Sequence, residues 1–327
     1  MKRPLLLPLV PLYRFGLAAR ERKFAQGSRS IRRLEWPVVS IGNLSAGGSG
    51  KTPLTIALAR ALKDRGVYVD VLSRGYGRRS ALPLAVDHKG RGEDFGDEPL
   101  EIAQEANIAV YVAAERYEAG LLAERASESA SRRVGVHLLD DGFQHRQLHR
   151  DVDILLLSRS DFADQLLPAG NLREPLRAAE RADVIAIPED EGELETEIKA
   201  RGWRAKMWRL KRRMEVPAIS GPAAAFCGIA RPEQFFAGVE RAGVKLAARF
   251  AFRDHHFFTQ ADLNRMADQA RTAGAVTLLT TEKDQVRLGS LTASLPIRVV
   301  KLHIEIEDAA AAVNSLLSKA SVKDSRQ

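Results

Sequence analysis

The chain has 327 residues, of which 28% are charged, and its formal net charge is +8 at pH 7. This length predicts about two domains, each able to bury a core. Cys227 is the only cysteine, which excludes a disulfide within the chain and a zinc site built from cysteines. Residues 1–33 hold nine Lys or Arg against one acid, Glu21, which leaves 41 basic and 41 acidic residues in the remainder. The charge excess therefore lies on an N-terminal arm, and the neutral body argues against a nucleic-acid partner.

The N-terminal arm, residues 1–35, combines a short apolar run with many basic residues. The run Pro4–Tyr13 contains two further prolines and is too short for a spanning helix, which needs about 20 apolar residues. One interpretation is an interfacial anchor, whose apolar side chains enter the lipid boundary: Leu5, Leu6, Leu7, Leu9, Val10, Leu12 and Phe15. Its basic side chains would then face anionic lipid headgroups: Arg14, Arg20, Arg22, Lys23, Arg29, Arg32 and Arg33. The alternative is an ordinary first helix packed on the core.

Residues 36–205 alternate short apolar runs with helix-like stretches such as Leu54–Lys63 and Arg116–Ala130. The runs are Val38–Ile41, Val67–Leu72, Ile108–Val112, Val134–Leu139, Asp153–Leu157 and Val184–Ile187. Continuous apolar strands that alternate with helices are typical of a parallel sheet covered on both faces. This segment is predicted to form one α/β domain.

Residues 206–306 are predicted to form a second, smaller α/β lobe. It is bounded by two extended segments, Lys206–Arg213 and Ile297–Ile306, which we expect to pair as a two-stranded ribbon that leads the chain out and back. Strand-like runs occur between them at Ala223–Cys227 and Val276–Thr281. Residues 307–327 then form a C-terminal helix, over Asp308–Ala320, and a tail.

The segment GNLSAGGSGKTP, residues 42–53, follows the first strand and predicts a phosphate-binding loop, which places the domain in the P-loop NTPase class. Its glycines permit unusual dihedral angles, so that backbone N–H groups wrap a phosphate of ATP at a helix N-terminus. Lys51 reaches the β- and γ-phosphates and the Thr52 hydroxyl ligates Mg²⁺. Ser45 stands where the usual pattern begins with glycine. The predicted ATP-binding residues are Ser45, Ala46, Gly47, Gly48, Ser49, Gly50, Lys51 and Thr52.

A second apolar run ends in Asp140 and Asp141, within the segment LLDDGFQH. A carboxylate at the carboxyl end of a strand beside a phosphate loop lies where Mg²⁺ or its waters need an oxygen anion. Adjacent acids point in different directions, so one of them would hold the metal and the other would position a loop or the substrate. The sequence leaves open which does which.

These two motifs, with further blocks along the chain, resemble the tetraacyldisaccharide 4'-kinase family, the lipid A kinases of Gram-negative bacteria. The blocks are LLDDGFQHRQLHRD, SRGYGR, GDEP, PAGNLREP, DHHFFT and TEKD. The resemblance implies transfer of the ATP γ-phosphate to the 4'-hydroxyl of a tetraacyldisaccharide 1-phosphate, on the cytosolic face of the bacterial inner membrane. It also implies a small hydroxyl residue at position 45, as found here.

The resemblance suggests two further catalytic residues. Asp97, in GDEP, is the candidate base that accepts the hydroxyl proton, although the residues alone fit a helix start equally well. His255, in DHHFFT, is the histidine expected to pair with Asp97 across the cleft between the lobes. Without the family, a structural histidine beside two phenylalanines would be favoured.

Three residues are candidates for substrate contact. Arg173 and Glu174, in NLREP, fit substrate or nucleotide contacts, with a surface ion pair as the alternative. Arg74, in SRGYGR, follows a strand at the carboxyl edge of the sheet and fits the acceptor's 1-phosphate or headgroup, with a solvated loop as the alternative. Lys283 and Asp284 of TEKD receive no role beyond lining the cleft.

The sequence is also compatible with two competing functions. A membrane-associated P-loop ATPase that switches a protein partner explains the loop, Asp140 and the basic arm, but not the second lobe with its Asp-His block. A kinase of a soluble metabolite requires that the arm be dispensable. The kinase interpretation predicts no obligatory protein partner.

Overall fold

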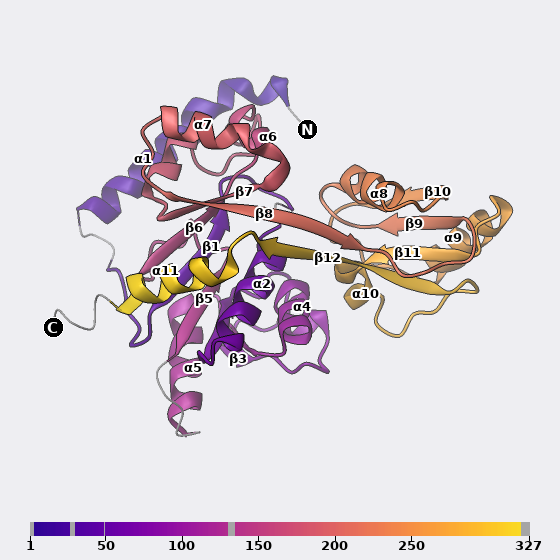
Figure 1. The fold of residues 1–327 in the computed structure, drawn as a ribbon, viewed down its shortest axis with the longest axis horizontal. Helices are drawn as coiled ribbons and strands as arrows, with labels where there is room; N and C mark the ends of the chain where they lie inside the picture. The colour runs from indigo at the N-terminus through magenta and orange to yellow at the C-terminus, as the bar shows by residue number, and fades with distance from the viewer. Residues whose placement is uncertain (1–2, 27–29, 49, 130–134, 322–327) are drawn as a thin grey trace.

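The computed structural model describes residues 3–26, 30–48, 50–129 and 135–321. Within these ranges twelve strands form one sheet, in the order β10-β9-β11-β12-β8-β7-β6-β1-β5-β2-β4-β3 (Figure 1). The strands are β1 Val38–Asn43, β2 Val69–Ser73, β3 Leu84–Ala85, β4 Ala109–Val112, β5 Val136–Asp140, β6 Val152–Leu156, β7 Val184–Pro188, β8 Lys206–Glu215, β9 Ala223–Cys227, β10 Leu246–Ala251, β11 Thr277–Thr281 and β12 Ile297–Ile306.

Helices cover both faces of this sheet. The α-helices are α1 Val10–Ala25, α2 Lys51–Asp64, α3 Gly92–Phe95, α4 Asp97–Ala106, α5 Arg116–Ser129, α6 Arg159–Phe162, α7 Glu193–Ala200, α8 Pro232–Arg241, α9 Gln260–Thr272, α10 Glu282–Leu288 and α11 Ala309–Ser321. Three 3₁₀ segments complete the set: η1 Pro4–Leu9, η2 Leu176–Arg181 and η3 Glu189–Glu191.

The larger body of the molecule is built on β1 to β7. Apart from the short antiparallel edge strand β3, these strands pair in parallel. Every residue of β1, β2, β5, β6 and β7 is buried, because helices cover both faces. That burial explains why these strands read as unbroken apolar runs rather than as alternating ones. The predicted P-loop type of parallel α/β core is confirmed.

A smaller body, built on β9 to β11, joins the larger one through β8 and β12. These two strands pair antiparallel, from Leu210 opposite Ile306 to Glu215 opposite Lys301, as the sequence predicted. Figure 1 shows both strands running from one body into the other. Because β8 also pairs with β7, and β12 with β11, the sheet continues through both bodies. The exact domain boundaries stay a prediction.

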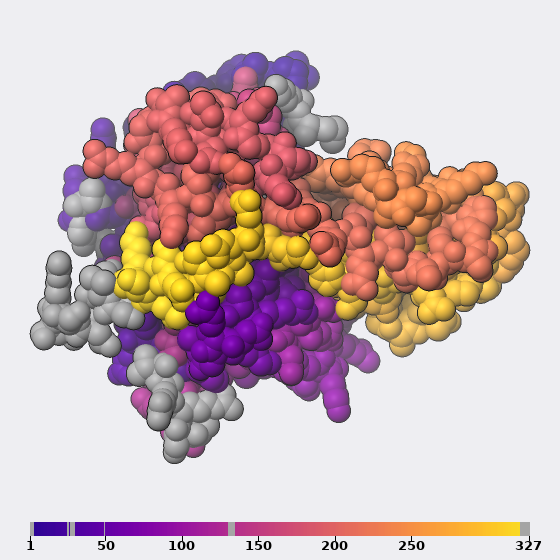
Figure 2. All heavy atoms as spheres, in the orientation of Figure 1, coloured from indigo at the N-terminus to yellow at the C-terminus, as the bar shows by residue number. Residues whose placement is uncertain are grey.

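The C-terminal helix α11 returns the chain to the larger body. It contacts α2, β6 and β12, and Figure 2 shows it lying across the larger body beside the α2 segment. Its buried residues Val313 and Leu316 belong to the same apolar core as β1 and α2. The end of the chain therefore packs against the helix that begins at the phosphate loop.

Helix α1 packs on the core along one side and exposes apolar side chains elsewhere, so each interpretation of the N-terminal arm describes part of it. Its residues Val10, Tyr13 and Leu17 pack on the core of the larger body, so the assignment of Val10 to the lipid boundary was wrong. Other apolar side chains of η1 and α1 are exposed: Leu5, Leu7, Leu9, Leu12 and Phe15. None of the helices in the described ranges has the length and apolarity needed to cross a bilayer.

Candidate active site

The phosphate loop connects β1 to α2 in the predicted place. Gly47 has φ +108° and Gly50, the residue before α2, has φ +90°, which only glycine adopts without strain. Lys51 and Thr52 form the first turn of α2, and the Thr52 side chain is buried. The backbone N–H groups at this helix N-terminus are suited to an anion. Ser49, which was also predicted to bind ATP, lies outside the described residues.

The first half of the loop is held to the segment that precedes Arg173. Ala46 N donates to Asn171 O at 2.7 Å, and the backbones of Ser45 and Leu172 pair as an isolated antiparallel β-bridge. Asn43 Nδ2 donates to the backbone oxygen of Ser45 at 2.7 Å and to its hydroxyl at 3.2 Å. Ser45 therefore shapes the turn, which explains how the loop forms without a leading glycine. Gly48 lies in the same turn, with open space around its Cα.

A charged cluster surrounds the base of the loop. Arg173 donates two hydrogen bonds to the Asp141 carboxylate, at 2.9 and 2.8 Å, and a third to Asn43 Oδ1 at 2.5 Å. Lys51 Nζ donates to the same Asn43 oxygen at 3.1 Å and lies 3.6 Å from Asp141. Burial favours the protonated form of Asp141, but its bonds to Arg173 and the charge of Lys51 outweigh burial, so its pKa is well below the ordinary value. Asp141 therefore holds the two cations in place.

Asp140 has a different environment. It ends β5 and is buried, and among the described residues its carboxylate receives only long contacts, from the hydroxyls of Thr55 and Ser73, both at 3.5 Å. Burial and the negative charges of Glu98 and Asp141 raise its pKa to about 7. A buried carboxylate with weak partners is poised to gain from a cation at the phosphate loop.

The predicted catalytic pair of Asp97 and His255 lies where the two bodies meet. Asp97 begins α4 in the larger body, and His255, with φ +61°, lies in the smaller body with its Nδ1 3.7 Å from Asp97 Oδ2. Arg287 of α10 lies against both: its Nε donates to Asp97 at 2.7 Å, and its Nη2 is 3.1 Å from His255 Nδ1. Burial raises the pKa of Asp97, but bonds to His255 and Arg287 outweigh burial and lower it. The predicted pair is therefore brought together, with Arg287 as an additional partner.

The TEKD segment supplies a second contact between the bodies. Lys283 Nζ donates to Glu98 Oε1 at 2.6 Å, and Asp284 accepts from the Gly228 backbone at 3.1 Å and from Arg287 at 3.0 Å. The charge of Lys283 lowers the pKa of Glu98 and outweighs burial, which raises it. Lys51 lowers this pKa further, and Asp141 raises it. A Cβ on Gly96 would lie 2.9 Å from the Cα of Gly75, which follows the carboxyl end of β2, so Asp97 and Glu98 begin α4 at the same end of the sheet as the phosphate loop.

Three residues were missed from the sequence: Asn43, Lys283 as the partner of Glu98, and Arg287. Asn43 is the last residue of β1, and its side chain bonds to Ser45 and Lys51 of the loop. Arg287 follows Asp284 at helical spacing, but its contact with Asp97 spans 190 positions. No local pattern predicts such a contact.

The three predicted substrate residues have different environments. Arg74 is exposed just after β2, and Arg173 is half-buried in the cluster described above. Glu174 is only 3% exposed, and its carboxylate binds Arg20 at 2.7 Å and also Arg181. Arg20 therefore points inward, against the expectation that it faces headgroups. These contacts favour the ion-pair alternative for Glu174.

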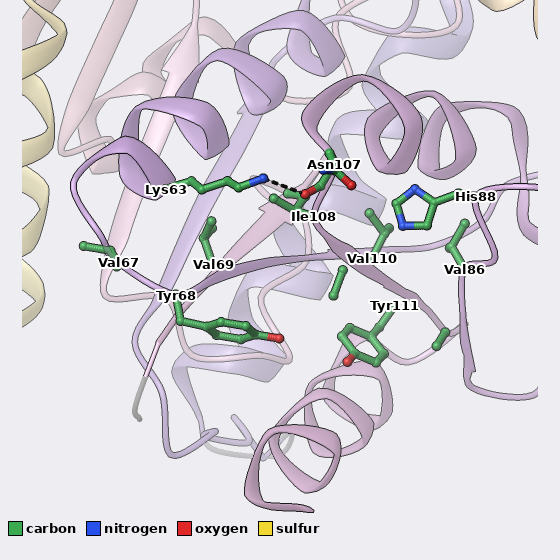
Figure 3. Close-up of a pocket in the computed structure, with 12 residues that line it drawn as sticks. Lys63, Val67, Tyr68, Val69, Val86, His88, Asn107, Ile108, Val110 and Tyr111 are labelled. Atoms are coloured by element: carbon green, nitrogen blue, oxygen red, sulfur yellow. Dashed lines mark hydrogen bonds between the residues drawn. The ribbon is translucent and has the colours of Figure 1, made fainter. Parts of the chain in front are cut away.

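A cavity of about 400 Å³ lies away from all these residues (Figure 3). It is lined by the first residues of β2 and β4, including Val69 and Val110, at the opposite end of the strands from Asp140. Lys63 donates to the backbone oxygen of Asn107 at its rim, at 3.0 Å. In open parallel sheets ligands bind outside the carboxyl ends of the strands, so this cavity is not the candidate active site.

The geometry thus unites a phosphate loop, a buried acid at the end of the neighbouring strand and an Asp-His pair shared by two bodies. Such a combination is suited to phosphoryl transfer. It defines the class of protein as a P-loop phosphotransferase.

The family described as "LpxK: Tetraacyldisaccharide-1-P 4'-kinase" matches residues 2–321. The chain belongs to this family. It is therefore an ATP-dependent kinase of lipid A biosynthesis.

Individual relatives agree with the family match. The chain is 40% identical over 324 residues to a "Tetraacyldisaccharide 4'-kinase" of Koribacter versatilis, covering 95% of this chain and 97% of that one. It is 36% identical over 303 residues to the protein of the same name from Geobacter metallireducens, covering 86% and 88%. A crystal structure of LpxK from Aquifex aeolicus in complex with ATP is 33% identical, with a TM-score of 0.74, and covers 96% of this chain and 98% of that one.

Proposed function

We propose that this enzyme transfers the γ-phosphate of ATP to the 4'-hydroxyl of tetraacyldisaccharide 1-phosphate, with Asp97 as the proton acceptor. The observation that carries the proposal is the contact between the bodies, because Asp97 lies 3.7 Å from His255 and follows Gly96, which packs against Gly75 beyond the carboxyl end of β2. Phosphoryl transfer to a sugar hydroxyl requires placement of the hydroxyl, neutralisation of charge and a base. The residues proposed for charge neutralisation and proton transfer, Lys51 and Asp97, lie at the same end of the sheet.

Asp97 is held ionised, which suits a group that must receive a proton. Its bond to Arg287 would weaken its basicity, so the acceptor hydroxyl has to replace Arg287 as its hydrogen-bond partner. His255 Nδ1 lies 3.1 Å from Arg287 Nη2 and 3.7 Å from Asp97 Oδ2, so the ring is near both side chains. We propose that His255 orients Asp97 once the hydroxyl is in place.

The loop residues are suited to Mg-ATP. Lys51, now bonded to Asn43, would donate to the β- and γ-phosphates. Thr52 and Asp140 fit a magnesium ion, since Asp140 has only long hydroxyl contacts while Asp141 is committed to Arg173 and Lys51. We therefore assign Asp140 to the metal and Asp141 to positioning. Bound Mg²⁺ would supply neutralisation of the phosphate charge.

The N-terminal arm supports a peripheral location on the cytosolic face of the bacterial inner membrane. Its exposed apolar side chains, such as Leu5, Leu12 and Phe15, are accompanied by the exposed cations Arg14 and Arg22. Such a surface gains energy both from apolar burial and from anionic headgroups. The enzyme would then meet its acceptor, which carries four acyl chains, at the membrane surface.

The test compares the wild type with Asp97→Asn and with Asp94→Asn, an exposed acid of α3 as the matched control. Labelled γ-phosphate is followed from Mg-ATP to tetraacyldisaccharide 1-phosphate in mixed micelles. We expect wild type and Asp94→Asn to label the lipid equally, and Asp97→Asn to be about 10²- to 10⁴-fold slower, because the base is lost. ATP hydrolysis without labelled lipid in the wild type would support the ATPase-switch alternative instead.

A further inference from the structure

Arg287 lies at the contact between the two bodies, and its side chain is only 2% exposed. It follows Asp284 on α10 at i, i+3 spacing, which places both side chains on one face of the helix. Its Nη1 donates to Asp284 Oδ1 at 3.0 Å and to the backbone oxygen of Gly228 at 2.7 Å. Asp284 is fixed in turn, because Thr281 Oγ1 donates to it at 2.7 Å and Gly228 N at 3.1 Å. One end of the guanidinium is therefore anchored within the smaller body.

The rest of the guanidinium faces the proposed catalytic pair. Its Nε donates to Asp97 Oδ2 at 2.7 Å, and its Nη2 lies 3.1 Å from His255 Nδ1. A guanidinium is planar and rigid, so an anchor at Nη1 also fixes the directions in which Nε and Nη2 point. Arg287 thus sets the position of Asp97, from the larger body, relative to His255, from the smaller one.

The Asp97 carboxylate is enclosed on two sides. A Cβ on Gly92 would lie 2.4 Å from Oδ1, so the backbone of α3 lies against that oxygen, whereas Oδ2 faces Arg287 and His255. Within the described ranges, these two are the basic side chains within 4.0 Å of the carboxylate. The other charged or titratable side chains on the segments around it are Lys51 of α2, Tyr76, Glu93 and Asp94 of α3, Glu98 and Glu101 of α4, Asp254, and Lys283 and Asp284 of α10. Burial raises the pKa of Asp97, and the hydrogen bonds and charges of His255 and Arg287 lower it.

We propose that Arg287 is a positioning residue for phosphoryl transfer, which aligns Asp97 with His255 and keeps a fixed positive charge beside the base. This inference rests on the proposed function, in which Asp97 accepts the proton of the acceptor hydroxyl. When that hydroxyl takes the place of Nε at Asp97, the bonds from Nη1 to Asp284 and Gly228 still hold the guanidinium near the carboxylate. The charge then favours the ionised form, which alone can receive the proton. Arg287 itself neither gives nor takes a proton, because its guanidinium stays protonated.

A purely structural role is the alternative, since an ion pair between Arg287 and Asp97 would also hold the two bodies together. The contact of Lys283 with Glu98, at 2.6 Å, already joins the same two helices. The two roles differ in their pH dependence. Loss of a structural contact lowers the amount of active enzyme by the same factor at every pH, whereas loss of a charge beside the base changes the pH at which the base becomes ionised.

The experiment measures kcat/KM for tetraacyldisaccharide 1-phosphate in mixed micelles from about pH 4.5 to about pH 8, with saturating Mg-ATP so that the nucleotide site is filled in every enzyme. The enzymes are the wild type, Arg287→Gln, Arg287→Lys and Arg241→Gln, an exposed arginine of α8 as the matched control. We expect the acid limb of the profile to lie about 1–3 pH units higher in Arg287→Gln than in the wild type, because the cation is lost. Arg287→Lys should keep the wild-type acid limb but lose about 10- to 100-fold at pH 8, because one amine cannot replace three nitrogens of a rigid fork. Arg241→Gln should match the wild type at every pH.

Three results would overturn the assignment. One is an acid limb of Arg287→Gln at the wild-type pH; another is the same loss in Arg287→Gln and Arg287→Lys at every pH, which would leave only the structural role. The third is full activity of Arg287→Lys, and this comparison decides alone if thermal melting shows that Arg287→Gln does not fold.

Asp97→Asn, measured in parallel, separates this inference from the proposed function. If Asp97→Asn is as active as the wild type, the proposed function itself is contradicted. If Asp97→Asn is inactive but the acid limb of Arg287→Gln is unshifted, only the role of Arg287 is contradicted.

Discussion

His137 shows how single residues determine the pH response of the fold. It lies fully buried on β5 between two acids, with Nδ1 2.6 Å from Asp70 and Nε2 3.4 Å from Glu124. Its ring stacks on Trp36 at 5.0 Å. Burial alone would lower its pKa, but Asp70 and Glu124 outweigh burial and raise it to about 9.

The free energy of unfolding should therefore depend on pH through His137. A histidine with a raised folded-state pKa contributes fully below about 6.5, its unfolded value, and this contribution is lost as pH rises through about 9. We expect a decrease of about 3 kcal/mol across this window, measured by urea unfolding at pH 6.5, 7.5 and 9. His137→Gln should flatten the slope, whereas the exposed His88→Gln should retain it. An unchanged slope in His137→Gln would refute the assignment.

At the scale of elements, β1 and the turn that carries Asp141 meet at a glycine. A Cβ on Gly42 would lie 2.6 Å from Phe143 Cβ and 2.9 Å from Phe143 N. Phe143 cannot move away easily, because it is fully buried and Arg181 lies 4.0 Å over its ring. The close approach also permits the bond from Gly142 N to Ile41 O, at 3.0 Å.

Gly42→Ala should therefore separate the strand from the turn. We expect the free energy of unfolding to fall by about 1–3 kcal/mol, as in overpacked cores, and kcat to fall because Asn43 and Asp141 move apart. Chemical denaturation and the lipid kinase assay measure the two effects. The control is Gly16→Ala in helix α1, where nothing lies within 4 Å and alanine favours the helix. Equal stability of the two variants would count against the packing argument.

Much of the element pattern could be predicted, because buried parallel strands and a phosphate loop have strong local signals. The pairing of Lys206–Arg213 with Ile297–Ile306 was also predicted. Strand β10 was missed, since it lies at the sheet edge with no buried residue in its six positions. In the site, loop residues follow from their spacing, whereas the bond from Arg287 to Asp97 depends on how two distant helices pack.

At the scale of the whole molecule, the helix that bears the exposed apolar side chains also contacts the site. The Tyr13 hydroxyl donates to the backbone oxygen of Arg173 at 2.9 Å, and Arg20 binds Glu174. Arg173 in turn holds Asp141. Helix α1 therefore supports the segment beside the phosphate loop, and it also carries exposed apolar side chains such as Leu12 and Phe15.

The proposed membrane contact and the support of the site can be separated by substitution. Changing Leu5, Leu12 and Phe15 to Ser should weaken binding to vesicles containing anionic lipid at least about tenfold, because each removes exposed apolar surface. Thermal stability should stay the same, since Tyr13 and Arg20 are intact. Cosedimentation with vesicles gives the binding, and Leu82→Ser with Val276→Ser, also exposed, serves as control. Equal vesicle binding by both variants would exclude α1 as the membrane contact.

The unbroken sheet constrains how the two bodies can move. Backbone hydrogen bonds continue from β10 through β12 and β8 to β3, so no flexible linker separates the bodies. Any change in their relative angle must be taken up as added or reduced twist in the β8 and β12 pair. The paired strands β8 and β12 therefore resist rotation of one body against the other. Opening and closing would follow one rotational coordinate, along which the contacts of Asp97 with Arg287 and of Glu98 with Lys283 lengthen or shorten together.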